Sequence, residues 1–134
     1  MGYYRAQQYR KRSEATEQEA VIAWCGWMER QHPELKLLYH IPNGGSRNKI
    51  EAANLKRQGV KAGVPDLCLP VPRGGFHGLY IEMKYGRNKT TGNQEEWLEA
   101  LAKLGYKTAV CYGAEEARRV IKDYLGIKEA GETT

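Results

Sequence analysis

Two short apolar runs joined by a glycine-containing linker constrain the fold more than any other feature of this chain. They lie in the segment GVPDLCLPVPRGGFHGLYIEMK, residues 63–84. The turn-forming linker PRGGFHG between them predicts an antiparallel pair of strands over about residues 66–71 and 79–85. Three charged residues interrupt these runs: Asp66, Glu82 and Lys84. A charge is costly to bury without a partner, so these residues require either a function or a paired network.

The rest of the chain supplies helices and strands around this hairpin. Hydrophobic spacing and capping residues such as Ser13 and Ser46 predict helices over about 13–31, 46–58, 93–104 and 114–126. The apolar face of the first helix is expected to include Ala20, Val21 and Trp27. Further strands are predicted over 35–41 and 106–112. The order α-β-α-β-β-α-β-α indicates an α/β fold with a mixed central β-sheet flanked by helices.

Length and composition limit the domain organisation and the protein class. A chain of 134 residues is expected to form one domain, over 13–126, with a basic N-terminal arm over 1–12 and a flexible C-terminal tail over 127–134. No apolar run approaches the roughly 20 residues that cross a bilayer. The N-terminus also lacks the apolar stretch of a secretory signal, so we expect a cytoplasmic protein with no membrane partner.

The three cysteines and the charge balance narrow the class further. Cys25, Cys68 and Cys111 lie far apart in the sequence, which favours free buried thiols over a disulfide framework or a zinc cluster. The net charge is +5, and the basic residues gather over 1–12, over 47–61 and after Lys84. Such clusters attract polyanions, although ordinary solvated surface charge is the alternative.

The charged residues of the hairpin predict a metal site. Side chains alternate along a strand, so Glu82 and Lys84 share one face, and pairing of the two strands brings Asp66 close to both. Two adjacent carboxylates repel unless a cation lies between them, and oxygen ligands favour Mg²⁺ or Mn²⁺ over zinc. The alternative is a surface ion pair of Glu82 with Lys84 and an unrelated turn at Asp66.

A third carboxylate lies on the first predicted helix. Glu17 precedes Val21 by four residues and Trp24 by seven, so it shares the face expected to be buried, whereas Glu14 and Glu19 lie off that stripe. From there Glu17 can reach the sheet and complete a metal site. The other explanation is the general preference for acids in the first turn of a helix.

These residues resemble a known family. Asp66 after Pro65, followed by Glu82-Met83-Lys84, resembles the PD-(D/E)XK nuclease superfamily. The segments TEQEAVIAW, IPNGG, LKRQGVKAGVPDL, YIEMK and NQEEWLEAL resemble more narrowly the VRR-NUC domain, the virus-type replication-repair nuclease, over about residues 14–113. The resemblance implies a restriction-endonuclease-like core and a Mg²⁺-dependent DNA endonuclease, with Mn²⁺ able to substitute.

The resemblance also implies roles for individual residues. Asp66 and Glu82 would be metal ligands, Glu17 the helix acid, and Lys84 the catalytic lysine that orients or deprotonates the attacking water. Met83 would offer only its backbone carbonyl as a further ligand. Gln94 occupies the place of a glutamine that the family presents from a helix, but Thr91 and Gln94 also form a capping-box pattern, and both readings stay open.

The substrate and partners follow from the same resemblance. We expect DNA to be bound by the basic residues that lead toward the site: Arg47, Lys49, Lys56, Arg57, Lys61, Arg87 and Lys89. Stand-alone phage members look like homodimers suited to four-way (Holliday) junctions, which places the protein in a bacterial or phage-infected cell. The alternatives are a sequence-specific restriction-type endonuclease and a non-catalytic DNA-binding module with a relict nuclease fold.

Overall fold

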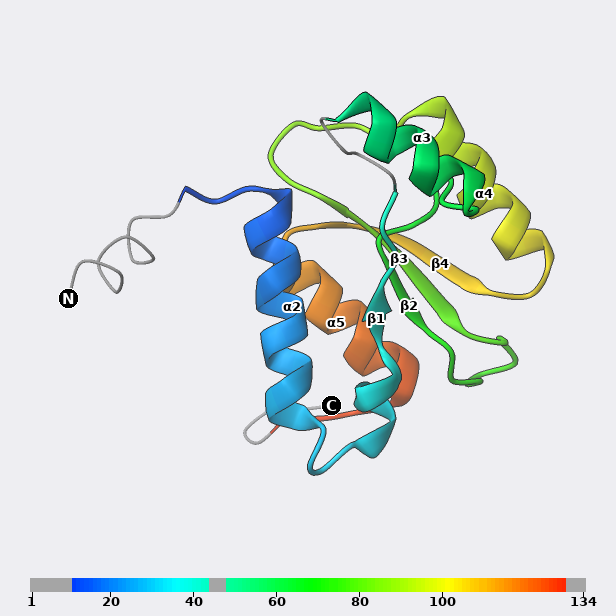
Figure 1. Ribbon diagram of the computed structural model, residues 1–134. Coiled ribbons are helices and arrows are strands. Elements are labelled where there is room, and N and C mark those ends of the chain that lie inside the picture. The colour runs from blue at the N-terminus through cyan, green and yellow to red at the C-terminus, as the bar shows by residue number, and fades with distance from the viewer. Residues whose placement is uncertain (1–10, 44–47, 130–134) are drawn as a thin grey trace.

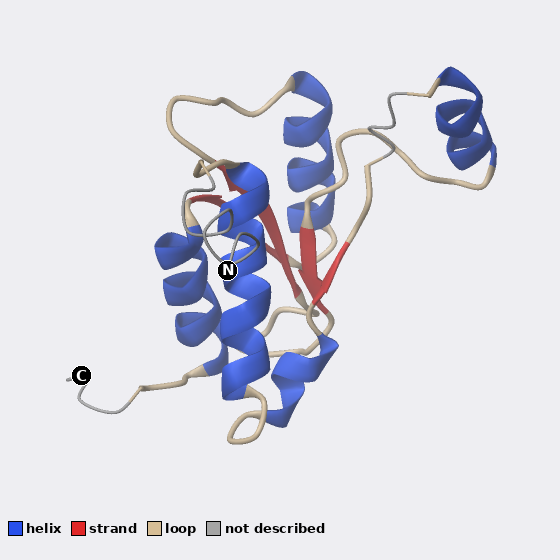
Figure 2. Cartoon of the chain, turned by 60° about the vertical axis from the view of Figure 1, so that its left-hand side comes forward, coloured by secondary structure: helices blue, strands red, loops and turns tan. Residues whose placement is uncertain are grey.

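The protein folds as a mixed four-stranded β-sheet between helices, as the computed structural model shows for residues 11–43 and 48–129 (Figure 1). In chain order the elements are α2 (Glu14–Met28), the 3₁₀ helix η1 (Pro33–Leu37), β1 (Tyr39–His40), α3 (Lys49–Arg57), β2 (Leu67–Leu69), β3 (Leu79–Lys84), α4 (Gly92–Lys103), β4 (Lys107–Tyr112) and α5 (Ala114–Leu125). Helices α2 and α5 pack together on one face of the sheet, and α4 lies on the other face (Figure 2). The predicted α/β fold class is confirmed.

The sheet has the strand order β1-β2-β3-β4. Strands β2 and β3 form the predicted antiparallel hairpin, with Leu67 opposite Ile81 and Leu69 opposite Leu79. Strand β4 runs parallel to β3, with α4 as the crossover between them, as a parallel connection requires. The hairpin therefore occupies the centre of the sheet and has a neighbour on each side.

The apolar core lies between the sheet and the α2–α5 pair. From the sheet it takes alternate residues of the central hairpin, and from the helices it takes the inward stripe. Its members include Val21, Cys25, Leu35, Leu67, Leu69, Leu79, Ile81, Met83, Cys111, Ala117 and Ile121. All three cysteines are buried and free, which confirms the sequence prediction. The side chain of Met83 is 1% exposed, so the residue between Glu82 and Lys84 faces the core as expected.

Three local predictions differ from the structure. Residues 35–41 were expected to form one strand, but Pro33 starts a 3₁₀ turn that ends at Leu37, and only Tyr39–His40 is strand. The side chain of Asn48 caps α3, accepting hydrogen bonds from two backbone amides, so this helix begins later than predicted. Trp27 is 82% exposed, because the buried stripe of α2 is narrow and consists of Glu17, Val21 and Cys25.

The ends of the packed region also differ from the expected boundaries. Ile127 is buried, and the carboxylate of Glu129 accepts a hydrogen bond from the indole of Trp24, so the packed chain extends into the predicted tail. Arg12, the last residue of the predicted N-terminal arm, pairs with Glu17. Residues 1–10, the predicted cap Ser46 and the predicted DNA contact Arg47 lie outside the described residues. Among the described residues, no helix has the length and apolar character of a membrane span.

Candidate active site

The central hairpin brings Asp66, Glu82 and Lys84 together. Asp66 directly precedes β2, and one of its carboxylate oxygens accepts a hydrogen bond of 2.7 Å from the backbone amide of Met83 in β3. Glu82 and Lys84 are separated by this one residue and share a face of β3, where the ammonium lies 3.4 Å from the Glu82 carboxylate. The sequence-based expectation that these three residues meet is therefore realised by strand pairing.

Glu82 carries the strongest electrostatic perturbation at this site. It is 2% exposed, and burial, together with the nearby Asp66 carboxylate, raises its pKa to about 8, even though Lys84 acts in the opposite direction. At neutral pH the metal-free site therefore favours a protonated Glu82. Two carboxylates placed so close together in a desolvated position are the arrangement that a bound cation relieves.

Lys84 is also surrounded by acids on more than one element. It is 5% exposed, and besides Glu82 its ammonium lies 3.9 Å from a carboxylate oxygen of Glu14 in the first turn of α2. Asn88, in the loop after β3, donates a hydrogen bond to the other oxygen of Glu14. The helix acid that reaches Lys84 is thus Glu14. Sequence spacing missed it because Glu14 lies off the buried stripe and approaches the site from the end of the helix.

Glu17, predicted as the helix acid of the metal site, lies where α2 meets the start of α5. It is buried, as expected, but its carboxylate accepts a hydrogen bond of 2.9 Å from Arg12 and one of 3.2 Å from the backbone amide of Ala114 at the start of α5. The hydrogen bond from Arg12 lowers the pKa of Glu17. Glu17 therefore connects α2 to α5 and is already satisfied by these partners. Its assignment as a metal ligand stays a prediction.

Gln94 forms the capping box that the sequence offered as one of its two readings. The Thr91 hydroxyl accepts a hydrogen bond from the backbone amide of Gln94, and the side-chain oxygen of Gln94 accepts one of 2.9 Å from the backbone amide of Thr91. This reciprocal pair begins α4 and holds the Gln94 carbonyl oxygen in a structural role. A part in catalysis remains a prediction for the side-chain amide nitrogen.

The predicted DNA-contacting residues that the structure describes are all exposed. Arg87 and Lys89 lie in the loop between β3 and α4, three and five residues after Lys84. The other four lie on α3 or just after it: Lys49, Lys56, Arg57 and Lys61. The segment that precedes α3 contacts the site at Asp66. The backbone amide of Ile41 donates a hydrogen bond of 2.8 Å to the Asp66 carbonyl oxygen, and the Nδ1 atom of His40 lies 2.9 Å from the same oxygen.

The donor set at the hairpin fits a hard divalent cation. Within residues 11–43 and 48–129, no three His, Cys, Asp or Glu side chains are grouped to hold a metal ion by themselves. Asp66 and Glu82 are the two carboxylates at the hairpin that would hold such an ion. Mg²⁺ is commonly bound by one or two carboxylates while water and substrate phosphate complete its shell, so this set suits Mg²⁺ better than a soft metal.

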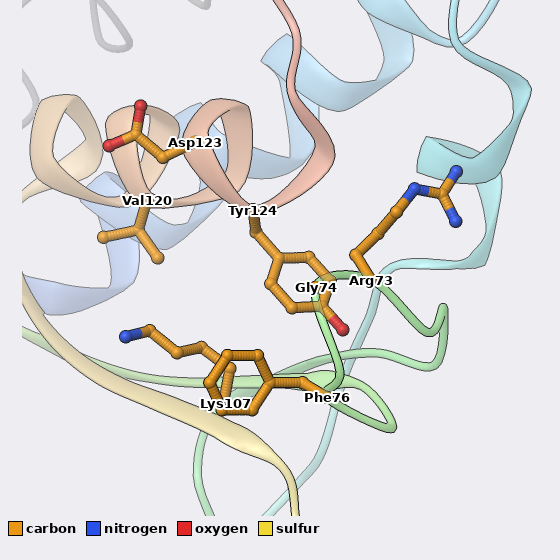
Figure 3. Close-up of a pocket in the computed structure, with 7 residues that line it drawn as sticks. All are labelled: Arg73, Gly74, Phe76, Lys107, Val120, Asp123 and Tyr124. Atoms are coloured by element: carbon orange, nitrogen blue, oxygen red, sulfur yellow. The ribbon is translucent and has the colours of Figure 1, made fainter.

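A separate hollow lies at the opposite end of the sheet. It has a volume of about 380 Å³ and is lined by residues that include Phe76, Lys107 and Tyr124 (Figure 3). Lys107 begins β4 opposite the first residue of β3, whereas Lys84 is the last residue of β3. None of the predicted catalytic residues lines this hollow, and the Lys107 ammonium already lies 5.6 Å from the centre of the Phe76 ring. The hairpin is therefore the candidate active site.

Comparisons with known proteins identify the family of the chain. The profile of the VRR-NUC domain matches residues 5–115. A solved structure described as a VRR_NUC domain protein aligns with a TM-score of 0.72 and 36% sequence identity, over 90% of this chain and 93% of that chain. Comparison with curated proteins gives no match. VRR-NUC domains are nuclease domains of the PD-(D/E)XK superfamily, whose members generally use divalent metals. The match covers most of the chain and includes Asp66, Glu82 and Lys84, so this protein belongs to the VRR-NUC family.

Proposed function

We propose that the protein is a Mg²⁺-dependent DNA endonuclease that hydrolyses phosphodiester bonds, prefers branched DNA such as four-way junctions, and acts as a homodimer. The observation that carries the nuclease proposal is the cluster of Asp66, Glu82 and Lys84 at the central hairpin, in which Glu82 and Lys84 are buried and the pKa of Glu82 is raised to about 8. A charge cluster of this kind in the centre of a sheet is costly unless a substrate or ion compensates it.

Each residue of the cluster has a role that follows from its position. Asp66 and Glu82 would hold the divalent ion, with the Met83 carbonyl as an additional oxygen ligand. A divalent ion bound there supplies positive charge to the scissile phosphate and lowers the pKa of the attacking water. The Lys84 ammonium, held between Glu82 and Glu14, places a further positive charge beside the phosphate and orients the water.

Glu14 is a residue of α2 that the sequence analysis did not place at the site. It contacts Lys84, whereas the Glu17 carboxylate is occupied by Arg12 and Ala114. We assign Glu14 to the positioning of Lys84 and Glu17 to the packing of α2 against α5. The exposed basic residues of α3 and of the loop after β3 would contact the phosphate backbone, giving binding that weakens with salt.

A cleavage assay tests the proposal directly. Purified protein is incubated with end-labelled four-way junction, flap and fully paired linear DNA, with Mg²⁺, Mn²⁺ or a chelator. We expect cleavage with either metal, none with chelator, and faster cleavage of the branched substrates. Protein carrying Asp66→Asn, purified in parallel, controls for contaminating nucleases and should be inactive.

The same assay separates the alternatives. No cleavage of any substrate with either metal would reject the enzyme and favour a DNA-binding module with a relict fold. Cleavage of linear DNA at one sequence, with no preference for branches, would indicate a restriction-type enzyme. Light scattering tests the homodimer, because symmetric cutting of two strands requires paired sites and a monomer would contradict it.

A further inference from the structure

Residues 42–43 and 48–65 belong to an extension that leaves the sheet after Ile41 and returns to it at Asp66; we call these described residues the α3 extension. It contains α3, which has no buried residue and stands away from the rest of the molecule (Figure 2). Ile50 at its start is 74% exposed. A helix that packs no apolar face into the core contributes little to stability, so its presence calls for a different explanation.

The return path of the α3 extension is held close to the site. Gly63 has a positive φ of 90°, and a Cβ atom at this position would lie 2.8 Å from the Cβ of Asn93, in the first turn of α4. Only glycine allows so close an approach. The outgoing path is held by the hydrogen bond from the Ile41 amide to the Asp66 carbonyl. Both connections therefore fix the base of the extension beside the candidate metal ligand Asp66.

Inside the α3 extension lies a hollow of about 450 Å³. It is lined by Asn43, Ala52, Lys56, Val60, Lys61 and Ala62. The volume is within the range of about 300–1,000 Å³ that is usual for small-ligand sites. Three small aliphatic side chains supply apolar surface, and two lysines supply positive charge. Within the described part of the chain, neither lysine forms an ion pair.

We propose that this hollow binds one unpaired nucleotide of the DNA substrate. The flat face of a base would pack against Ala52, Val60 and Ala62, and its phosphate would contact Lys56 and Lys61. The inference rests on the proposed function and deepens it by naming the feature of the substrate that is recognised. Charge supports this occupant, because residues 48–63 contain four basic residues and a single acid, Glu51.

An intact double helix does not fit this site. Its bases are stacked and paired, and a hollow for one small ligand admits a base only after it has left the stack. DNA near a branch or a bulge already has such bases, so it needs less energy to present one. Asn43 and Ala62 of the hollow lie two residues after Ile41 and four residues before Asp66, so an unpaired nucleotide held there would direct the neighbouring phosphates toward the cleavage site.

Filling the hollow tests the proposal. Ala52→Leu adds bulk inside it, while Ala53→Leu adds the same bulk on the exposed side of the same helix and serves as the matched control. Affinity is measured by fluorescence anisotropy, with chelator present so that no cleavage occurs. The probes are a paired duplex and the same duplex with one unpaired nucleotide.

We expect the natural protein to bind the duplex with the unpaired nucleotide about tenfold more tightly, on the scale of one base contact. Ala52→Leu should remove this preference and leave affinity for the paired duplex unchanged, whereas Ala53→Leu should keep it. Lys61→Gln should also reduce it. Equal binding of both probes by the natural protein, or an unchanged preference in Ala52→Leu, would overturn the inference. Neither result bears on metal-dependent cleavage, whose failure is detected separately by the cleavage assay.

Discussion

The central hairpin and the α3 extension both carry charged residues, but the environments of these charges are opposite. Glu82 and Lys84 are 2% and 5% exposed, on a strand with a neighbour on each side. Lys49, Lys56, Arg57 and Lys61 are all exposed, on or after a helix with no buried residue. The charges of the hairpin interact through a desolvated interior, whereas those of the extension are screened by water and salt.

This difference assigns different tasks to the two regions. Buried charges at fixed positions alter the pKa of their neighbours and can act on a transition state. Exposed charges on a helix with no buried residue can reorient toward a bound polyanion. They are expected to affect the affinity for DNA more than the rate of cleavage. We therefore expect substitutions in the hairpin to reduce turnover, and substitutions in the α3 extension to reduce binding.

The largest expected effect comes from the same substitution made in each region. Lys84→Met preserves length and apolar bulk but removes the charge, so the cleavage rate at saturating DNA should fall at least about 100-fold with little change in affinity. Lys56→Met should leave that rate unchanged and lower the salt-dependence slope of binding by about 0.9. Single-turnover kinetics and salt titrations measure both. Loss of rate in Lys56→Met, or retained cutting in Lys84→Met, would break the comparison between the regions.

A second pair of substitutions distinguishes the two acids of α2. Glu14→Gln should reduce cleavage by about tenfold or more, because it removes a charged partner that positions Lys84. Glu17→Gln should leave cleavage near normal and cost about 1–2 kcal/mol of unfolding free energy, because the bonds to Arg12 and Ala114 are weakened.

Single-turnover cleavage and urea unfolding of both variants give the result. If Glu17→Gln were inactive with unchanged stability, the role implied for Glu17 by the family resemblance would be restored.

The smallest expected effect concerns stability as a function of pH in the metal-free protein. A carboxyl whose pKa is raised to about 8 binds more protons in the folded than in the unfolded state between its ordinary value and that pH. Its contribution to stability therefore falls as the pH rises through this window. Glu82→Gln removes the effect, so the variant should melt about 3 °C or more above the natural protein at pH 8, with a smaller gap at pH 5.

Thermal melts in chelator check this prediction. Glu99→Gln, in an exposed pair with Lys103, is the control and should follow the natural protein at both pH values. Parallel melting curves for Glu82→Gln and the natural protein across this pH range would contradict the raised pKa.

Much of the fold could be predicted because the relevant signals are local. The hairpin, the sheet strands over 79–85 and 106–112, and the helices around them follow from period-two and period-3.6 patterns with glycine boundaries. The prediction of one strand over 35–41 was wrong, because Pro33 starts a 3₁₀ helix over Pro33–Leu37 and the buried Leu35 lies in that helix. Trp27 was placed inside because spacing alone does not show how wide the buried stripe of a helix is.

By itself the sequence determined which chemical groups are present and which of them share a strand. Asp66, Glu82 and Lys84 could be grouped because strand alternation and hairpin pairing are nearly rigid rules. Only the tertiary structure decided that Glu14 reaches Lys84, that Glu17 pairs with Arg12 and Ala114, and that the α3 extension encloses a hollow. Those contacts join elements far apart in the chain, and their geometry depends on how whole helices pack, which no local pattern encodes.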